Sequence, residues 1–195
     1  MFFSKTAAPL KDSLQETAAR LLVTPTALAD LSAQDARVVV SYMLPQRLVQ
    51  GTVFINEGEV SHTDFMMLII VGEVLVQSEM SNSNDGAVVS VIGPGSMIGE
   101  MGLLDGEPRS ASCTATTDLT VAILPRDALL QLIKSKPAVA ARFMLAMSKR
   151  LSDRLREANR KIKTLHALNR ALQQELDVAH MPIESLNKAG RDKVN

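Results

Sequence analysis

The sequence predicts an α+β chain that is mainly β, an antiparallel β-roll or jelly roll flanked by N-terminal helices and a long C-terminal coiled-coil helix. Three observations support this prediction. Residues 10–44 carry apolar side chains at helical spacing, residues 48–124 hold short β-branched runs between turn sequences, and no Gly or Pro interrupts the chain from Pro137 to Pro182. We expect three parts, namely a β-roll with its N-terminal helices at 1–136, a dimerisation helix at 137–181 and a flexible tail at 182–195.

Two helices are expected before the β region. The first carries a regular set of apolar side chains, which are Leu10, Leu14, Ala18, Leu21 and Leu22, and Pro25 interrupts it. The second begins at Ser32, because the segment from Ser32 to Asp35 is a short-chain version of a capping box, and it ends before Pro45.

Four strands are expected from the β-branched runs, at Thr52–Ile55, Met67–Val76, Val88–Ile92 and Leu119–Leu124. Glycine, proline and short polar residues lie between them, and the SNSNDG sequence at 81–86 is expected to form a hairpin tip. A further helix is expected near Asp127, and Pro137 suits the first turn of the last helix.

Composition excludes several classes of protein. The longest apolar run, Phe65–Val71, is too short to cross a bilayer. The N-terminus has no long apolar stretch behind a basic start, so we expect no secretory signal. The lone Cys113 fits a core residue in a reducing compartment, so we expect a cytoplasmic protein without membrane contact. Residues 1–136 carry 9 basic and 15 acidic side chains, a net charge of −6, whereas residues 137–195 carry 12 and 6, a net charge of +6.

The segment 98–111 contains the most informative motif. Gly99 and Gly102 bracket a predicted turn of helix, where missing side chains and free N–H groups favour an anion. Arg109 offers a planar charged fork for a phosphate diester, while Ser110 offers a donor and Glu100 an acceptor for sugar hydroxyls. An ion pair between Glu100 and Arg109 across a hairpin is the alternative. The candidate ligand-binding residues are Gly99, Glu100, Met101, Gly102, Arg109, Ser110 and Ala111.

This segment resembles the phosphate-binding cassette of the cyclic-nucleotide-binding domain family, which includes catabolite activator proteins and protein kinase A regulatory subunits. The matching runs are Ile98-Gly-Glu-Met-Gly-Leu103 and Pro108-Arg-Ser-Ala111, with glycine-marked hairpins upstream, and the resemblance covers about residues 25–155. It implies that Glu100 accepts the ribose 2′-hydroxyl, that Arg109 binds the cyclic phosphate, and that Ser110 and the backbone amides of 99–102 complete the phosphate cradle.

Two departures from the family pattern concern the base and one loop. Where the activator proteins present Thr-Ser to the adenine, this chain has about Arg154-Leu155, so the base contacts do not carry over. The segment from Gly58 to Gly72 is about two residues longer than in the activator proteins. The choice of base stays open, with cAMP favoured over cGMP. The helix-turn-helix domain of the activator proteins is not expected here.

A heptad seam runs along the last helix. Its d positions are Leu151, Ala158, Leu165, Leu172 and Ala179, and its a positions are Leu155, Ile162, Asn169 and Leu176. One Asn at an a position with Leu at d favours a parallel two-stranded coil, so we expect a homodimer through 145–180. A helix packed on its own domain is the alternative.

A basic stretch overlaps this seam and consists of Lys149, Arg150, Arg154, Arg156, Arg160, Lys161 and Lys163. The seam continues through the stretch, so the helices cannot fork around DNA, and we interpret the charges as a solvated face. The histidines His62, His166 and His180 are scattered, and we expect no catalytic residue, metal site or cofactor.

The leading hypothesis is therefore a dimeric cyclic-nucleotide sensor that signals through an unknown protein partner and is not an enzyme. The alternatives are a dimerisation scaffold whose nucleotide site no longer binds, and a DNA-binding regulator that uses the basic helix.

Overall fold

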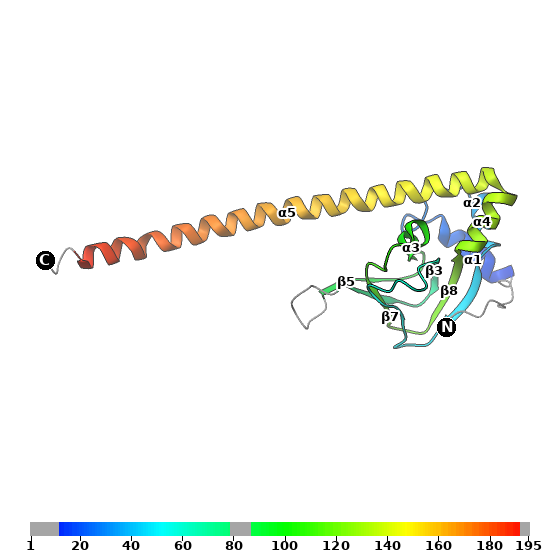
Figure 1. The fold of residues 1–195 in the computed structure, drawn as a ribbon, viewed down its shortest axis with the longest axis horizontal. Helices are drawn as coiled ribbons and strands as arrows, with labels where there is room; N and C mark the ends of the chain where they lie inside the picture. Colours follow the sequence, from blue (N-terminus) through cyan, green and yellow to red (C-terminus); the bar gives the residue numbers. More distant parts are fainter. Residues whose placement is uncertain (1–11, 79–86, 192–195) are drawn as a thin grey trace. The chain divides into compact units, whose positions relative to one another are not determined.

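The computed structural model describes residues 12–78 and 87–191 (Figure 1). The chain divides into two compact units, residues 1–148 and residues 149–195. In the described residues, the first unit contains both β-sheets, helices α1 to α4 and the first turns of α5, and the second unit contains the remainder of α5.

Eight described strands form two four-stranded antiparallel sheets. The first sheet has the order β1 (Leu44–Leu48), β8 (Leu119–Pro125), β3 (Phe65–Val71) and β6 (Met97–Ile98). The second has the order β2 (Val53–Ile55), β7 (Ser112–Ala115), β4 (Val74–Ser78) and β5 (Ala87–Ile92). With helices before the sheets and a long helix after them, the predicted α+β class and antiparallel β-roll are confirmed.

Strand β3 lies between two apolar cores, which explains why its sequence is a continuous apolar run. Met66, Leu68 and Ile70 belong to a core shared with the helices. Phe65, Met67 and Ile69 belong to a core between the two sheets. Successive side chains of a strand point to opposite faces, so a strand covered on both faces is apolar throughout.

The first core is closed by helices α1 (Asp12–Leu22), α2 (Ala33–Val40) and α4 (Arg126–Ser135) together with the first turns of α5. The predicted start of α2 is confirmed, since the Ser32 hydroxyl accepts a hydrogen bond from the Asp35 amide at 3.1 Å. At the C-terminal end of α4, the Ser135 hydroxyl lies 2.6 Å from the Tyr42 hydroxyl and shares a hydrogen bond with it.

Some strand predictions were wrong. The expected strand Met67–Val76 is two strands, because at Gly72, which has a φ of +94°, the chain leaves the first sheet and enters the second. A Cβ there would lie 2.4 Å from the carbonyl oxygen of Asp118, so only glycine fits. Strands β1, β6 and β7 were not expected. The predicted hairpin tip at 81–86 lies outside the described residues.

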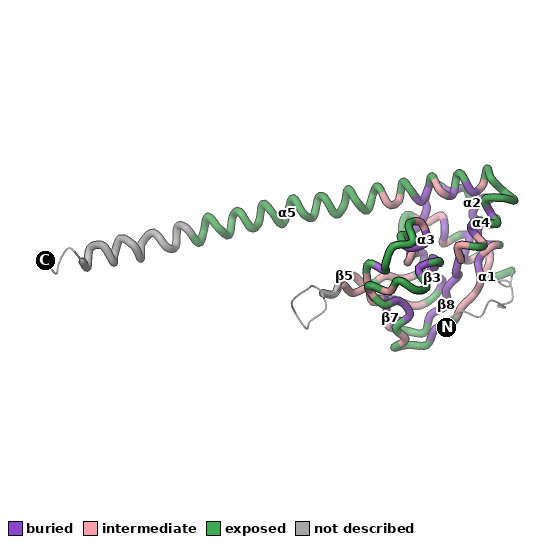
Figure 2. The backbone as a smooth tube through the Cα atoms, in the orientation of Figure 1, coloured by how far each residue is buried: buried purple, intermediate pink, exposed green. Residues whose placement is uncertain are grey.

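Helix α5 runs from Pro137 to Arg191, which confirms the predicted long C-terminal helix and places Pro137 in its first turn. Ala140, Phe143 and Met147 anchor its start in the core of the first unit. In the second unit every residue from 152 to 176 is exposed in the single chain (Figure 2). The backbone helix continues ten residues past the predicted boundary at 181, and the three-part division and the flexible tail stay predictions.

No described helix is both long enough and apolar enough to span a bilayer.

A buried carboxylate fixes the start of α5 within the first unit. The Arg142 guanidinium donates two hydrogen bonds to Asp35, from Nε to Oδ2 and from Nη2 to Oδ1, both at 2.7 Å. The Ser32 hydroxyl donates a third at 2.8 Å, and the Asp35 side chain is only 8% exposed. The bonds from Arg142 first, and then the one from Ser32, hold the pKa of Asp35 below its ordinary value against desolvation, which raises it.

We predict that Asp35→Asn lowers the melting temperature by about 3 to 6 °C, because a bidentate charge-assisted contact is lost at a buried position. A carboxylate whose pKa is depressed in the native state adds stability above the ordinary aspartate pKa of 3.8, and this stability is lost as the pH falls through the native pKa. Thermal melts of wild type and variant should therefore converge below that pH.

Glu16→Gln is the matched control. Glu16 accepts the same bidentate contact from Arg37, at 2.9 and 2.8 Å, but both side chains are more than half exposed. Exposed ion pairs contribute little, so we expect a change of at most about 2 °C. Equal effects of the two substitutions at neutral pH would contradict the role given to Asp35.

Candidate functional site

The predicted cassette begins where β6 ends and the short helix α3 (Glu100–Asp105) starts. Gly99 caps α3 in the left-handed conformation, with a φ of +78°, and the Leu103 amide donates to its carbonyl. A Cβ at Gly99 would lie 2.6 Å from Nη1 of Arg109. Both the backbone conformation and the close approach of the arginine therefore require glycine at this position.

The second cassette glycine also lies close to Arg109, although its φ is not left-handed. A Cβ at Gly102 would lie 3.1 Å from the carbonyl oxygen of Thr63 and 3.2 Å from Nη1 of Arg109. From the sequence we explained both glycines by the approach of a ligand to the backbone. In the structure the group that approaches them is the arginine side chain of the same cassette.

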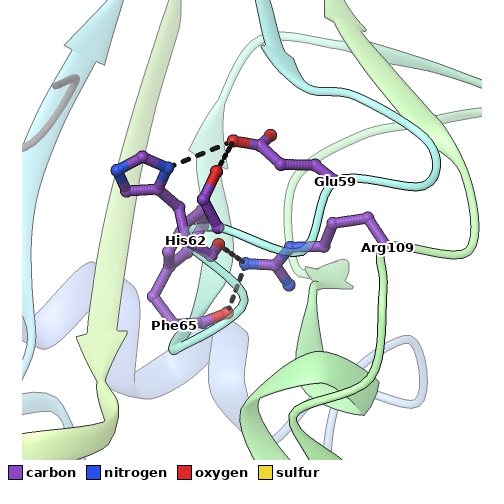
Figure 3. A network of polar contacts seen from close by, with 5 residues as sticks. Glu59, His62, Phe65 and Arg109 are labelled. Carbon is purple, nitrogen blue, oxygen red and sulfur yellow. Dashed lines mark hydrogen bonds and ion pairs between the residues drawn. The ribbon is translucent and has the colours of Figure 1, made fainter.

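The Arg109 side chain lies at the centre of the site and is held by backbone carbonyls (Figure 3). Its Nη1 donates to the carbonyl of Gly99 at 3.0 Å, and its Nη2 donates to those of His62 at 2.7 Å and Phe65 at 3.2 Å. The guanidinium carbon also lies 4.4 Å from the centre of the Phe65 ring, a cation–π distance. Among the described residues these bonds use three of the five N–H donors of an arginine, which leaves two for a ligand.

Arg109 is buried, with 5% of its surface exposed. Desolvation lowers its pKa, and the nearby carboxylates of Glu59, Asp64 and Glu100 act in the opposite direction. An arginine keeps its charge under such a shift. The site thus offers a fixed positive charge with a defined orientation.

His62 lies in the loop between β2 and β3, and Phe65 is the first residue of β3. The amide of Gly58 donates to the Arg109 carbonyl at 2.8 Å, and the Arg109 amide donates to the Glu59 carbonyl at 3.1 Å, so the backbone of Arg109 is paired with the loop as well. His62 has a φ of +66°, which is rare for a residue with a side chain, and this conformation accompanies the carbonyl that accepts from Arg109.

Side chains within the loop hold this conformation. The Glu59 carboxylate is 3.1 Å from Nδ1 of His62 and accepts a hydrogen bond from the Ser61 hydroxyl at 3.2 Å (Figure 3). Desolvation raises the pKa of Glu59, but the hydrogen bonds with His62, Ser61 and the Asn56 backbone, together with the charge of His62, outweigh it, so the net shift is downward. His62 and Phe65 were not predicted as site residues, because a backbone carbonyl leaves no residue pattern, and the extra length of the segment from Gly58 to Gly72 was the only signal in the sequence.

The remaining predicted residues lie in the first turn of α3 and in the segment directly before β7. Glu100, 5% exposed, lies in the first turn of α3, where a carboxylate interacts favourably with the helix dipole. Met101 is 45% exposed, and its sulfur lies 4.0 Å from the hydroxyl oxygen of the exposed Ser110. Ala111 follows, half-buried, directly before β7. The segments 99–102 and 109–111 therefore contact each other, through Met101 with Ser110 and through Arg109 with Gly99.

Cys113 lies in the core between the sheets, as predicted for a structural residue. Burial raises the pKa of its thiol to about 12, so it stays protonated at neutral pH. Within the part of the chain that the structure describes, no three His, Cys, Asp or Glu side chains are grouped so that they could hold a metal ion.

Comparisons with known proteins agree on one family. The sequence profile of the cyclic nucleotide-binding domain matches residues 45–136. A solved cyclic nucleotide-binding domain from Methylobacillus flagellatus superposes with a TM-score of 0.65 and 32% identity, over 75% of this chain and 80% of that one.

Two curated relatives are regulatory proteins. A CRP-like cAMP-activated global transcriptional regulator from Mycobacterium tuberculosis is 27% identical over 129 residues, which are 66% of this chain and 53% of the regulator. A cAMP-dependent protein kinase regulatory subunit from Yarrowia lipolytica is 32% identical over 106 residues, 54% of this chain and 27% of the subunit. The chain thus spans about half the length of the mycobacterial regulator and about a quarter of the kinase subunit.

This chain therefore belongs to the cyclic nucleotide-binding domain family, as its β-roll, the cassette around Arg109 and the extent of its match to the solved domain together show.

Proposed function

We propose that this protein is a cytoplasmic cyclic-nucleotide sensor, not an enzyme, that binds its ligand at the cassette, dimerises through α5 and signals through a protein partner. The ligand-binding residues are Gly99, Glu100, Met101, Gly102, Arg109, Ser110 and Ala111. The observation that carries the proposal is the orientation of Arg109. Three backbone carbonyls hold its guanidinium in one orientation, so little ordering entropy has to be paid on binding.

The roles of the other residues follow from their positions. Two N–H donors of Arg109 are left for the cyclic phosphate, and the exposed Ser110 hydroxyl lies next to it in sequence. Glu100 supplies a carboxylate for the ribose hydroxyl, in the first turn of the helix that Gly99 begins. We favour cAMP over cGMP, since two of the relatives are named for cAMP.

We predict that Arg109→Lys weakens cyclic-nucleotide binding by about 10- to 100-fold, because an ammonium cannot keep the carbonyl bonds and a phosphate bond together. Titration calorimetry with cAMP and with cGMP measures the affinity and identifies the base. Arg37→Lys is the matched control, since Arg37 makes an exposed bidentate bond to Glu16 and is not part of the cassette.

Arg109→Lys can also disturb folding, so Ser110→Ala tests the same site at an exposed position. Loss of one neutral hydrogen bond should weaken binding by about 3- to 10-fold while the melting temperature of the free protein stays unchanged. Unchanged affinity in both variants would contradict the assigned site.

The dimerisation proposal is supported by the apolar side chains that α5 exposes in the single chain. Leu155, Ile162, Leu165, Leu172 and Leu176 are each at least half exposed and follow the predicted a and d positions. Exposed leucines at this spacing are stabilised when a second helix covers them, and Asn169 at an a position selects two parallel strands.

We predict that Leu165→Glu, at a d position, raises the dimer dissociation constant by about 100-fold or more, because each chain buries a carboxylate in place of a leucine. Leu168→Glu is the control, since Leu168 is similarly exposed, at 56% against 63%, but lies at a g position beside the seam. Sedimentation velocity at micromolar concentration distinguishes the two. If both variants dimerise equally well, the seam is assigned wrongly.

A dimerisation scaffold without ligand is the second candidate function. It is favoured by the burial of Arg109, whose three carbonyl bonds also make it a structural residue. Dimers that show no heat of binding with cAMP or cGMP would support this candidate.

DNA binding through the basic helix is the weaker alternative. Two of its cations are paired along the helix, Arg156 with Asp153 at 2.9 Å and Lys161 with Glu157 at 3.3 Å. A salt-sensitive shift of duplex DNA in a gel would favour it.

A further inference from the structure

A second arginine, Arg126, contacts the cassette from α4, which follows the cassette in the sequence. It is the first residue of α4 and is half-buried. Its Nη2 donates to the carbonyl of Gly102 at 3.0 Å, inside the cassette helix α3. Its backbone amide donates to the carbonyl of Asp64 at 2.7 Å, in the loop before β3.

Arg126 and Arg109 bind the same two segments. Arg109 donates to Gly99 in the cassette, to His62 in the loop and to Phe65 at the start of β3. Arg126 donates to Gly102 in the cassette and to Asp64 in the loop. The hydroxyl of Thr63 adds a weak bond to the carbonyl of Gly106 at 3.4 Å. The cassette helix and the loop are therefore connected to each other and to the start of α4 through backbone carbonyls.

The contact lies at the C-terminal end of α3, where a cation is favourable. The Gly102 carbonyl accepts from the Gly106 amide at 3.0 Å and from Arg126 at 3.0 Å, so both of its lone pairs are used. A positive charge at this end also interacts favourably with the helix dipole. A charge-assisted bond is directional and weakens as α3 shifts, whereas the apolar contact of Leu103 with the helical core tolerates sliding.

We propose that Arg126 is a positioning residue that ties the cassette helix to α4, so that a ligand-dependent displacement of α3 reaches α4 and the first turns of α5. The route is short, because α4 follows β8 without a linker and only Lys136 separates it from α5. Both helices share the core that contains Leu129, Leu132 and Phe143. The proposal rests on the proposed function, since it names the path by which the bound cassette acts on the helices.

Hydrogen-exchange mass spectrometry of the full chain tests this proposal with Arg126→Gln, Arg126→Lys and the control Arg37→Gln, each with and without saturating cAMP. In wild type we expect cAMP to slow exchange in both α3 and α4. In Arg126→Gln, α3 should still respond, while the response of α4 falls to less than half. Arg126→Lys keeps one donor for the Gly102 carbonyl and should restore part of that response.

Exchange in the absence of nucleotide separates this proposal from the proposed function. Loss of a charge-assisted bond should speed exchange of α3 by about tenfold in Arg126→Gln and leave β3 unchanged. Uniformly faster exchange in α3 and β3 would indicate general destabilisation and overturn the positioning role. An α4 response to cAMP in Arg126→Gln that equals the wild-type response would also overturn the positioning role.

If calorimetry finds no cyclic nucleotide that binds wild type, the proposed function fails. In that case, a selective tenfold increase in the exchange rate of α3 in Arg126→Gln without nucleotide would still support the tie between Arg126 and the cassette. If the exchange rate of α3 did not change, that tie would be overturned.

Discussion

Burying the charge of Arg109 imposes the main constraint on the architecture of the site. A buried guanidinium is costly unless its N–H groups are bonded, and three backbone carbonyls meet this need here. For those carbonyls to converge, His62 takes a left-handed conformation, and Gly99 and Gly102 leave room for the side chain. The loop before β3 and the cassette are consequently one structural unit, although more than 30 residues separate them in the sequence.

The sequence was informative wherever a structure depends on neighbouring residues. The cap at Ser32, the start of α5 at Pro137 and the cassette glycines are local patterns, and the structure contains all of them. The cassette could be recognised because backbone conformation, phosphate chemistry and spacing all restrict the same few positions.

Contacts between distant residues could not be predicted in this way. The bond between Asp35 and Arg142 joins residues 107 positions apart, and the acceptors of Arg109 are carbonyls that any residue carries. Strand β1 begins with Leu-Pro and has little β-branched character, so its pairing with β8 at the edge of the sheet was not visible in the sequence. Strand β6 has only two residues, too few for a periodic pattern.

The bond between Tyr42 and Ser135 gives the protein a spectroscopic property. The chain contains one tyrosine and no tryptophan, so its tyrosine fluorescence comes from Tyr42. That ring is bonded to the last residue of α4, directly before α5 begins. The protein thus carries its single tyrosine fluorophore at the junction of α4 and α5, and a change there alters the tyrosine emission without any label.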